Sequence, residues 1–176
     1  MTPPPLPAPP SLRYLGGYPP DVLARVRALM AEGRLMETLK RRHAELHAVS
    51  NDRALYDYVG ELKARYMRNA PPLSKVRYDT TLHIVRNALG THTAVSRVQG
   101  NKLKAKREIR VASLFKDAPA PFLKMIVVHE LAHLKEPDHD RAFYSLCTHM
   151  EPAYHQLELD VRLWLTALEL APPGNR

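Results

Sequence analysis

The sequence predicts an α+β fold: an N-terminal helical layer and a small antiparallel sheet, both packed on one apolar helix that is followed by C-terminal helices. Three observations predict it. Positions 122–134 are apolar almost throughout, as in a helix that is buried on every side. Positions 73–111 carry short alternating and β-branched runs, which have the period of strands. The segments on either side place apolar residues on one helical face, which is typical of amphipathic helices.

The chain begins with a proline-rich segment that is not expected to pack. Residues 1–10 contain six of the 16 prolines and almost no large apolar side chain. This composition favours a disordered or polyproline-like tail over residues 1–11. The rest of the 176 residues suits one compact domain, which is expected to span 12–170.

Three helices are expected before the strands. The first begins at Pro19-Pro20-Asp21, because proline and an early aspartate suit a first helical turn, and it ends at Gly33. A short second helix begins at Leu35. The third begins after the capping side chains of Ser50-Asn51-Asp52 and closes before Pro71-Pro72. None of these helices carries recognisable chemistry.

The strand segment ends in a strongly basic stretch. Between Arg97 and Arg110 there are six basic residues and one acid, Glu108. Lysines that alternate with apolar residues can protect an exposed edge strand from pairing with another chain. The same side chains could instead form an anion-binding face beside an active site. The candidates for such a face are Arg97, Lys102, Lys104, Lys106 and Arg110.

Asp117 and Pro119 mark the expected start of the apolar helix. This helix contains the segment His129-Glu130-Leu131-Ala132-His133. Residues four apart lie on one face of a helix, so the two histidines can offer their imidazoles to one metal ion. Buried histidines also need a partner, and a cation supplies one. The segment therefore predicts a zinc site in which His129 and His133 are ligands.

A catalytic zinc ion usually has three protein ligands and one open position. His139 is the preferred third ligand, because Pro137 ends the helix and lets the chain fold back, with Asp138 capping a next helix that begins at His139. Glu151 is the main alternative. Glu158, His149 and His155 are the remaining ones.

Glu130 follows the first ligand directly, so its side chain leaves the helix at a different angle and suits the metal-bound water better than the metal. It is the predicted catalytic residue. Glu136, Asp138 and Asp140 could hold imidazole N–H groups or could cap the next helix. A second pair four residues apart, His43 and His47, stands in a basic stretch without a matching glutamate and is not assigned to a metal.

Composition sets weak limits on location and partners. A formal charge of +8 favours anionic partners such as nucleotides or nucleic acids. The single cysteine, Cys147, cannot form an internal disulfide, which fits a reducing compartment. No apolar run approaches the length of a membrane span, and the N-terminus lacks the pattern of a secretory signal. The chain is therefore expected to act in the cytoplasm, away from membranes.

The stretch from Val127 to Tyr144 resembles the YgjP-like metallopeptidase family, whose pattern HELxHxxxxxHxxxF it matches through Phe143. The resemblance extends to Gly16-Gly17-Tyr18-Pro19, to Arg68-Asn69-Ala70-Pro71-Pro72 and to residues 92–100. The chain is also similar to WLM and SprT-like proteases. Leu89-Gly90-Thr91-His92 departs from the Trp-Gly-Ser-Cys segment of many relatives, so no role is assigned to that loop.

The resemblance implies a zincin-like fold with His129, His133 and His139 as zinc ligands and Glu130 as the catalytic residue. It implies a metallopeptidase that cleaves a peptide or protein. YgjP-like proteins are also described as UTP pyrophosphatases, which implies a nucleotide substrate that enters with Mg²⁺. A third possibility is a nucleic-acid-associated protein whose basic face positions the chain.

Overall fold

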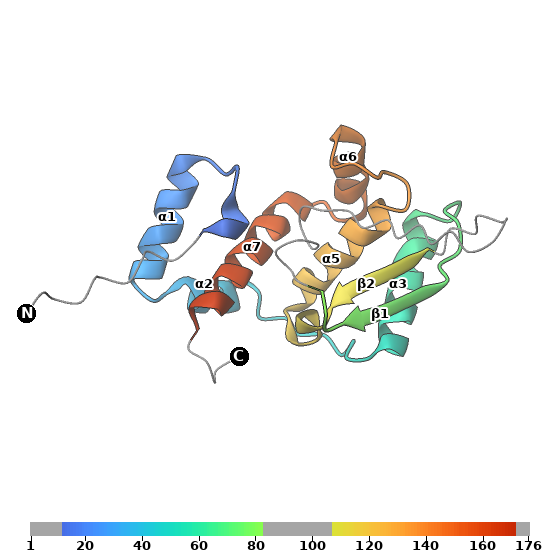
Figure 1. The fold of residues 1–176 in the computed structure, drawn as a ribbon, viewed down its shortest axis with the longest axis horizontal. Helices are drawn as coiled ribbons and strands as arrows, with labels where there is room; N and C mark the ends of the chain where they lie inside the picture. The colour runs from blue at the N-terminus through green and yellow to red at the C-terminus, as the bar shows by residue number, and fades with distance from the viewer. Residues whose placement is uncertain (1–11, 83–106, 172–176) are drawn as a thin grey trace, which may run out of the picture. The chain divides into compact units, whose positions relative to one another are not determined.

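The computed structural model describes residues 12–82 and 107–171 (Figure 1), which fall into two compact units. One unit comprises the described residues up to 42 together with those from 159 onward, and the other comprises the described residues within 43–158. The predicted tail, 1–11, lies outside the described residues. One domain spanning 12–170 stays a prediction, because it concerns whether the two units fold together.

The first unit is helical, as predicted. It contains a short 3₁₀ turn, η1 (Arg13–Leu15), then α1 (Pro20–Ala31), α2 (Leu35–Arg42) and the later part of α7 (Tyr154–Leu170). Proline occupies the first turn of α1, where its missing N–H costs nothing. Gly33 follows α1 with φ of +67°, a conformation that favours glycine and ends the helix.

Polar contacts fix η1 and α2 against the later part of α7. The Tyr14 hydroxyl donates to Glu169 Oε1 at 2.8 Å, and Arg162 Nη1 donates to the Tyr14 carbonyl at 2.8 Å. Arg42 pairs at 2.9 Å with Asp160, whose side chain is fully buried. A buried carboxylate is costly unless it is paired, so the Arg42 contact is expected to contribute to the stability of this unit.

The second unit contains the sheet and the remaining helices. In chain order these are α3 (Asp52–Tyr66), β1 (Lys75–Asp79), β2 (Glu108–Ala112), the 3₁₀ turn η2 (Ser113–Asp117), α5 (Ala120–Ala132), α6 (Arg141–Met150) and the start of α7. Asn51 caps α3 by accepting from the Ala54 N–H at 2.9 Å, as its capping side chain predicts.

The described strands pair in parallel, so the predicted antiparallel sheet is wrong for them. Lys75 aligns with Glu108 and Asp79 with Ala112, and the two arrows point the same way in Figure 1. Alternation identifies a strand but carries no direction, which depends on the connection between strands. A parallel pair needs a long connection between its strands, and here β1 ends at Asp79 whereas β2 begins only at Glu108. The other predicted strands lie within 83–106, outside the described residues.

The two faces of this sheet have opposite character. Val76, Tyr78, Ile109 and Val111 are buried and form the apolar face. The other face carries an ion-pair network: Arg77 Nε lies 2.8 Å and Arg110 Nε 3.4 Å from Glu108, and both arginines also approach Asp79. Because Arg77 and Arg110 are register partners, this network joins the two strands across the sheet.

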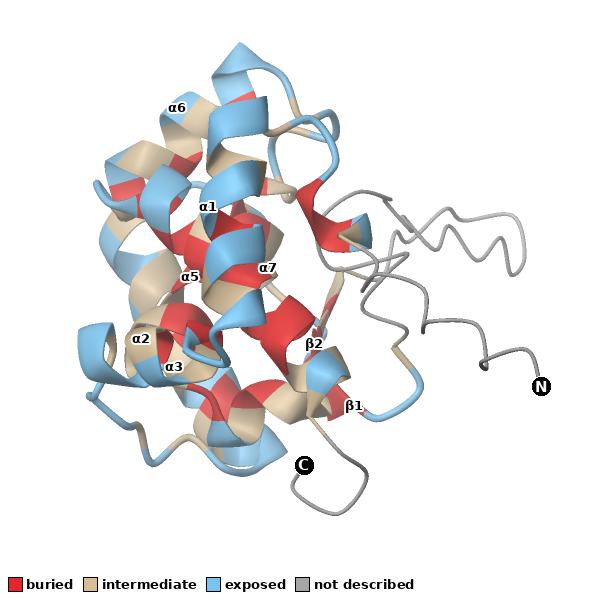
Figure 2. Ribbon diagram, turned by 90° about the vertical axis from the view of Figure 1, so that its left-hand side faces the viewer, coloured by how far each residue is buried: buried red, intermediate tan, exposed pale blue. Residues whose placement is uncertain are grey.

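Helix α5 is the core of the second unit, as its composition predicts. Pro119 precedes it and Pro121 lies in its first turn. Its residues from Phe122 to Ala132 are buried at nearly every position, and the helix is red over most of its length in Figure 2. Among the described residues, no helix combines the length and the apolar character that crossing a membrane would require.

Candidate metal centre

Three imidazoles meet at the C-terminal end of α5, where His129 lies in the last turn and His133 is the C-cap. The Nε2 atoms of His129 and His133 are 3.1 Å apart, and the Nε2 atom of His139 lies 3.3 Å from the first and 2.9 Å from the second. Among the described residues, these three form the group that could hold a metal ion. The histidines that the sequence predicts as ligands are therefore brought to one point.

The outer ring nitrogens of two histidines have partners that orient the rings. His133 Nδ1 lies 3.0 Å from the carbonyl oxygen of Glu136, to which it can only donate. His129 Nδ1 lies 2.7 Å from the hydroxyl of Tyr154. When Nδ1 carries the hydrogen, the lone pair of Nε2 points toward the other two rings, which is the arrangement a metal ion requires.

The donor set fits zinc. A tetrahedral zinc ion with bonds of about 2.0–2.1 Å holds its nitrogen ligands about 3.3 Å apart, so the observed triangle needs to widen only slightly. Facing lone pairs repel each other without a cation or a shared proton between them. Magnesium prefers oxygen ligands, whereas imidazole suits zinc and other transition metals.

Two features of α6 position His139. Asp140 caps the helix by accepting from the Phe143 N–H at 3.0 Å, which fixes the chain directly after His139. The fully buried ring of Phe143 then packs against all three imidazoles, with centroids 4.5–5.0 Å apart. The expectation that Asp138 caps a helix beginning at His139 is wrong, because α6 begins at Arg141 and its cap is Asp140.

Glu130 is half-buried and follows His129 on α5. Burial raises the pKa of its carboxyl group to about 8. Among the described residues, none forms a hydrogen bond with this carboxylate. It is therefore available to a water molecule or a substrate, and a cation at the triad would favour its charged form.

The alternative metal residues lie in other surroundings. Glu151 forms an ion pair with Lys124 at 2.5 Å and accepts from the Ala153 N–H. His47 is held by backbone groups: its Nδ1 accepts from the Val49 N–H, and its Nε2 lies 2.9 Å from the Phe115 carbonyl. Both ring nitrogens of His47 are therefore engaged by backbone groups.

Of the predicted anion-binding residues, only Arg110 is described, and its charge is already opposed by Glu108 and Asp79. Arg97, Lys102, Lys104 and Lys106 lie outside the described residues. Arg107, which the sequence did not single out, donates to the carbonyl of Leu134 at 3.4 Å, one residue beyond a metal-site histidine. In the sequence, Arg107 is only one of several basic residues in its segment. Its contact could not be predicted because the partner lies 27 positions away.

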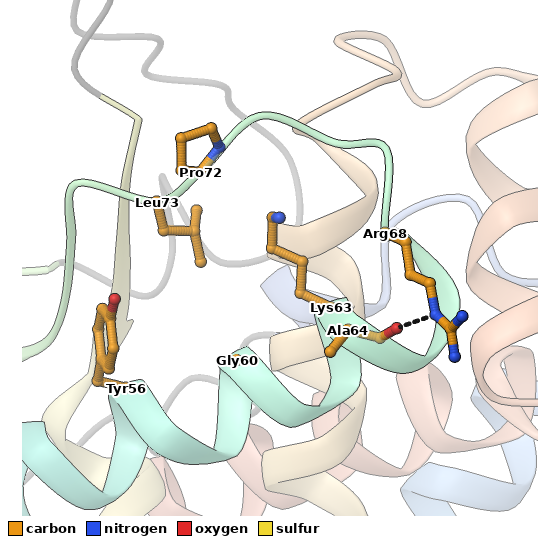
Figure 3. A pocket seen from close by; sticks show the side chains of 7 residues that line it. All are labelled: Tyr56, Gly60, Lys63, Ala64, Arg68, Pro72 and Leu73. Carbon is orange, nitrogen blue, oxygen red and sulfur yellow. Dashed lines mark hydrogen bonds between the residues drawn. The ribbon is translucent and has the colours of Figure 1, made fainter.

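A separate pocket of about 360 Å³ lies between α3 and the loop that follows it (Figure 3). Lys63 and Arg68 line it, and each also donates to a backbone carbonyl, of Ala70 and Ala64 respectively. None of the lining residues belongs to the histidine triad. The chemistry is therefore not assigned to this pocket.

Comparison with known proteins identifies the family of the chain. The model of the family described as YgjP-like, metallopeptidase domain, matches residues 79–162. Over 160 residues the chain is 60% identical to an Escherichia coli (strain K12) protein named UTP pyrophosphatase, covering 91% of this chain and 96% of that protein. The chain belongs to the YgjP-like family. As a YgjP-like protein it is a hydrolase, and the resemblance seen in the sequence is confirmed. No solved structure matches it.

Proposed function

We propose that this YgjP-like protein is a zinc-dependent hydrolase with His129, His133 and His139 as ligands and Glu130 as the catalytic residue, and that its substrate is UTP. The substrate proposal rests on the relative named UTP pyrophosphatase, which is 60% identical over nearly the whole of both chains. At that identity the residues around a site are expected to be largely shared. The converging imidazoles supply the metal centre that such a reaction can use.

Bound zinc would supply a Lewis acid that polarises a phosphoryl oxygen and makes water a better nucleophile at neutral pH. Glu130 would accept a proton from the attacking water. The new oxygen–phosphorus bond forms at the α-phosphorus while its bond to the bridging oxygen breaks. UTP and water thus become UMP and pyrophosphate. Magnesium would accompany the nucleotide rather than occupy the imidazoles.

Arg107 supports an anionic substrate. Its guanidinium group is half-exposed and approaches the residue after His133. A guanidinium group has five N–H donors, and one weak bond to Leu134 leaves others for phosphate oxygens. The backbone of Arg107 is fixed, because both the N–H and the hydroxyl of Ser74 donate to its carbonyl.

The test is hydrolysis of UTP to UMP and pyrophosphate by the zinc-loaded protein, with and without Mg²⁺. Glu130→Gln should keep zinc and lose activity by about 10²–10⁴-fold, since it cannot accept the proton. Glu61→Gln, which changes an exposed acid on α3, should leave the rate unchanged. Full activity of Glu130→Gln would show that Glu130 is not the catalytic residue. Full activity of the protein without zinc would show that the reaction does not need the metal.

A metallopeptidase is the second candidate, favoured by the description of the family model. The same residues can direct water at a peptide carbonyl. Cleavage of casein by the zinc-loaded protein, lost in Glu130→Gln and accompanied by no release of pyrophosphate from UTP, would favour it. Binding to DNA that weakens steeply with salt, in Glu130→Gln as in the native protein, would instead indicate nucleic-acid association.

A further inference from the structure

Tyr154, the first residue of α7, contacts His129 of the metal centre, although the two are 25 positions apart in the sequence. Its hydroxyl lies 2.7 Å from His129 Nδ1, and both side chains are buried, with exposed fractions of 0% and 2%. Water therefore has little access to this bond. Loss of the hydroxyl would leave an imidazole nitrogen buried without that partner, which is costly.

The direction of this hydrogen bond follows from the geometry of the triad. The Nε2 atom of His129 faces the Nε2 atoms of His133 and His139 at 3.1 and 3.3 Å. A metal ion held between them needs the bare lone pair of each Nε2, so the hydrogen of a neutral His129 must then lie on Nδ1. The oxygen of Tyr154 therefore accepts from His129 when the triad holds a metal.

We infer that Tyr154 is a positioning residue for the metal centre: its hydroxyl accepts from Nδ1–H of His129, holds that ring with Nε2 toward the other two imidazoles, and thereby raises the affinity of the triad for zinc. This inference rests on the proposed metal site. In a neutral histidine without the acceptor, the hydrogen can move to Nε2, where it would block the lone pair that the metal needs. Loss of a hydrogen-bond partner to a ligand of this kind weakens metal binding by about 10–100-fold.

The variant that isolates this role is Tyr154→Phe, which removes one oxygen and keeps the ring. Tyr78→Phe is the matched control, because Tyr78 is also buried and its hydroxyl donates to the Val49 carbonyl at 2.6 Å. The dissociation constant for zinc is measured by competition with a chelator, and the visible spectrum of the cobalt-substituted protein reports ligand geometry. Tyr154→Phe should weaken zinc binding by about 10–100-fold and alter the cobalt bands. Tyr78→Phe should change neither.

Equal zinc affinity in folded Tyr154→Phe and native protein would overturn the inference while leaving the proposed function intact. Failure of the native protein to bind zinc would overturn both. If Tyr154→Phe does not fold, nitrogen-15 NMR of the metal-free native protein decides: a proton on Nδ1 of His129 supports the inference, and a proton on Nε2 of a neutral ring overturns it.

Discussion

The imidazoles of the triad differ in how their outer nitrogens are held. His133 donates to a backbone carbonyl, that of Glu136, which no side-chain substitution removes. His129 depends on the hydroxyl of Tyr154. His139 precedes the cap of α6 and has the ring of Phe143 beside it. Substitutions that weaken the centre without touching a ligand are therefore expected at Tyr154 and Asp140.

Arg107 contacts the residue that follows His133, so its loss is expected to act on substrate binding. We expect Arg107→Ala to raise KM for UTP by about 10-fold or more, because a charge-assisted hydrogen bond contributes about 1.5–3 kcal/mol. Zinc affinity should not change. Steady-state kinetics with UTP measures this, and Arg53→Ala, which removes a cation that is 85% exposed on α3, controls for net charge. Equal effects of the two substitutions on KM would show that Arg107 acts only through the net charge of the protein and does not contact the substrate.

Thr81 is predicted to control the acid stability of the sheet. Its hydroxyl donates to Asp79 at 2.6 Å and its N–H at 2.8 Å, and these bonds hold the pKa of the Asp79 carboxyl below its ordinary value. The bond to the hydroxyl contributes its stability above the unfolded pKa of about 3.9, and that stability is lost as pH falls through the folded pKa. Thr81→Val should therefore be destabilised by about 1–2 kcal/mol at pH 7 and by less at acid pH.

Urea unfolding at neutral and acid pH measures this difference. Thr166→Val is the control, since the Thr166 hydroxyl is buried and donates to the neutral carbonyl of Arg162 at 2.8 Å. Its cost should not depend on the ionisation of a carboxyl group at that site. A Thr81→Val cost that stays constant with pH would show that the hydroxyl does not act through the charge of Asp79.

At the scale of an element, the N-terminus of α6 couples helix stability to metal affinity. Asp140→Ala should destabilise the fold by about 1 kcal/mol through loss of the cap, and should also weaken zinc binding because His139 is the preceding residue. Asn51→Ala removes the equivalent cap of α3. It should cost similar stability without changing zinc affinity, as measured by urea unfolding and chelator competition. Identical zinc affinities in the two variants would show that the Asp140 cap does not influence the binding of zinc by His139.

Helices, strands and caps could be predicted where the local sequence pattern determines the structure. The apolar run of α5, the Asn51 cap and the spacing of His129, His133 and His139 are local features. The direction of β2 relative to β1 was not predictable, because alternation is the same in parallel and antiparallel strands. Tyr154 and Arg107 were missed for a related reason: each is an ordinary residue in its own segment and gains its role through a partner 25 or 27 positions away.

At the scale of the molecule, one continuous helix belongs to both units. Helix α7 begins in the unit of the metal centre, with Tyr154, and its residues from 159 onward belong to the other unit. The single tryptophan, Trp164, lies in that later part and is 8% exposed. Trp164 fluorescence therefore reports unfolding of the first unit, whereas the proposed zinc ligands lie in the second.

Zinc should stabilise both units together if residues 12–170 fold as one domain. A ligand that binds only the folded state adds about 2.7 kcal/mol at a free concentration of 100 times its Kd. We expect zinc to shift the thermal transitions of Trp164 fluorescence and of far-ultraviolet circular dichroism by the same amount. The shift should vanish in His139→Ala and persist in His155→Ala, which removes an exposed imidazole outside the triad. If zinc raises the midpoint temperature of the circular dichroism transition but leaves that of Trp164 fluorescence unchanged, the two units unfold independently.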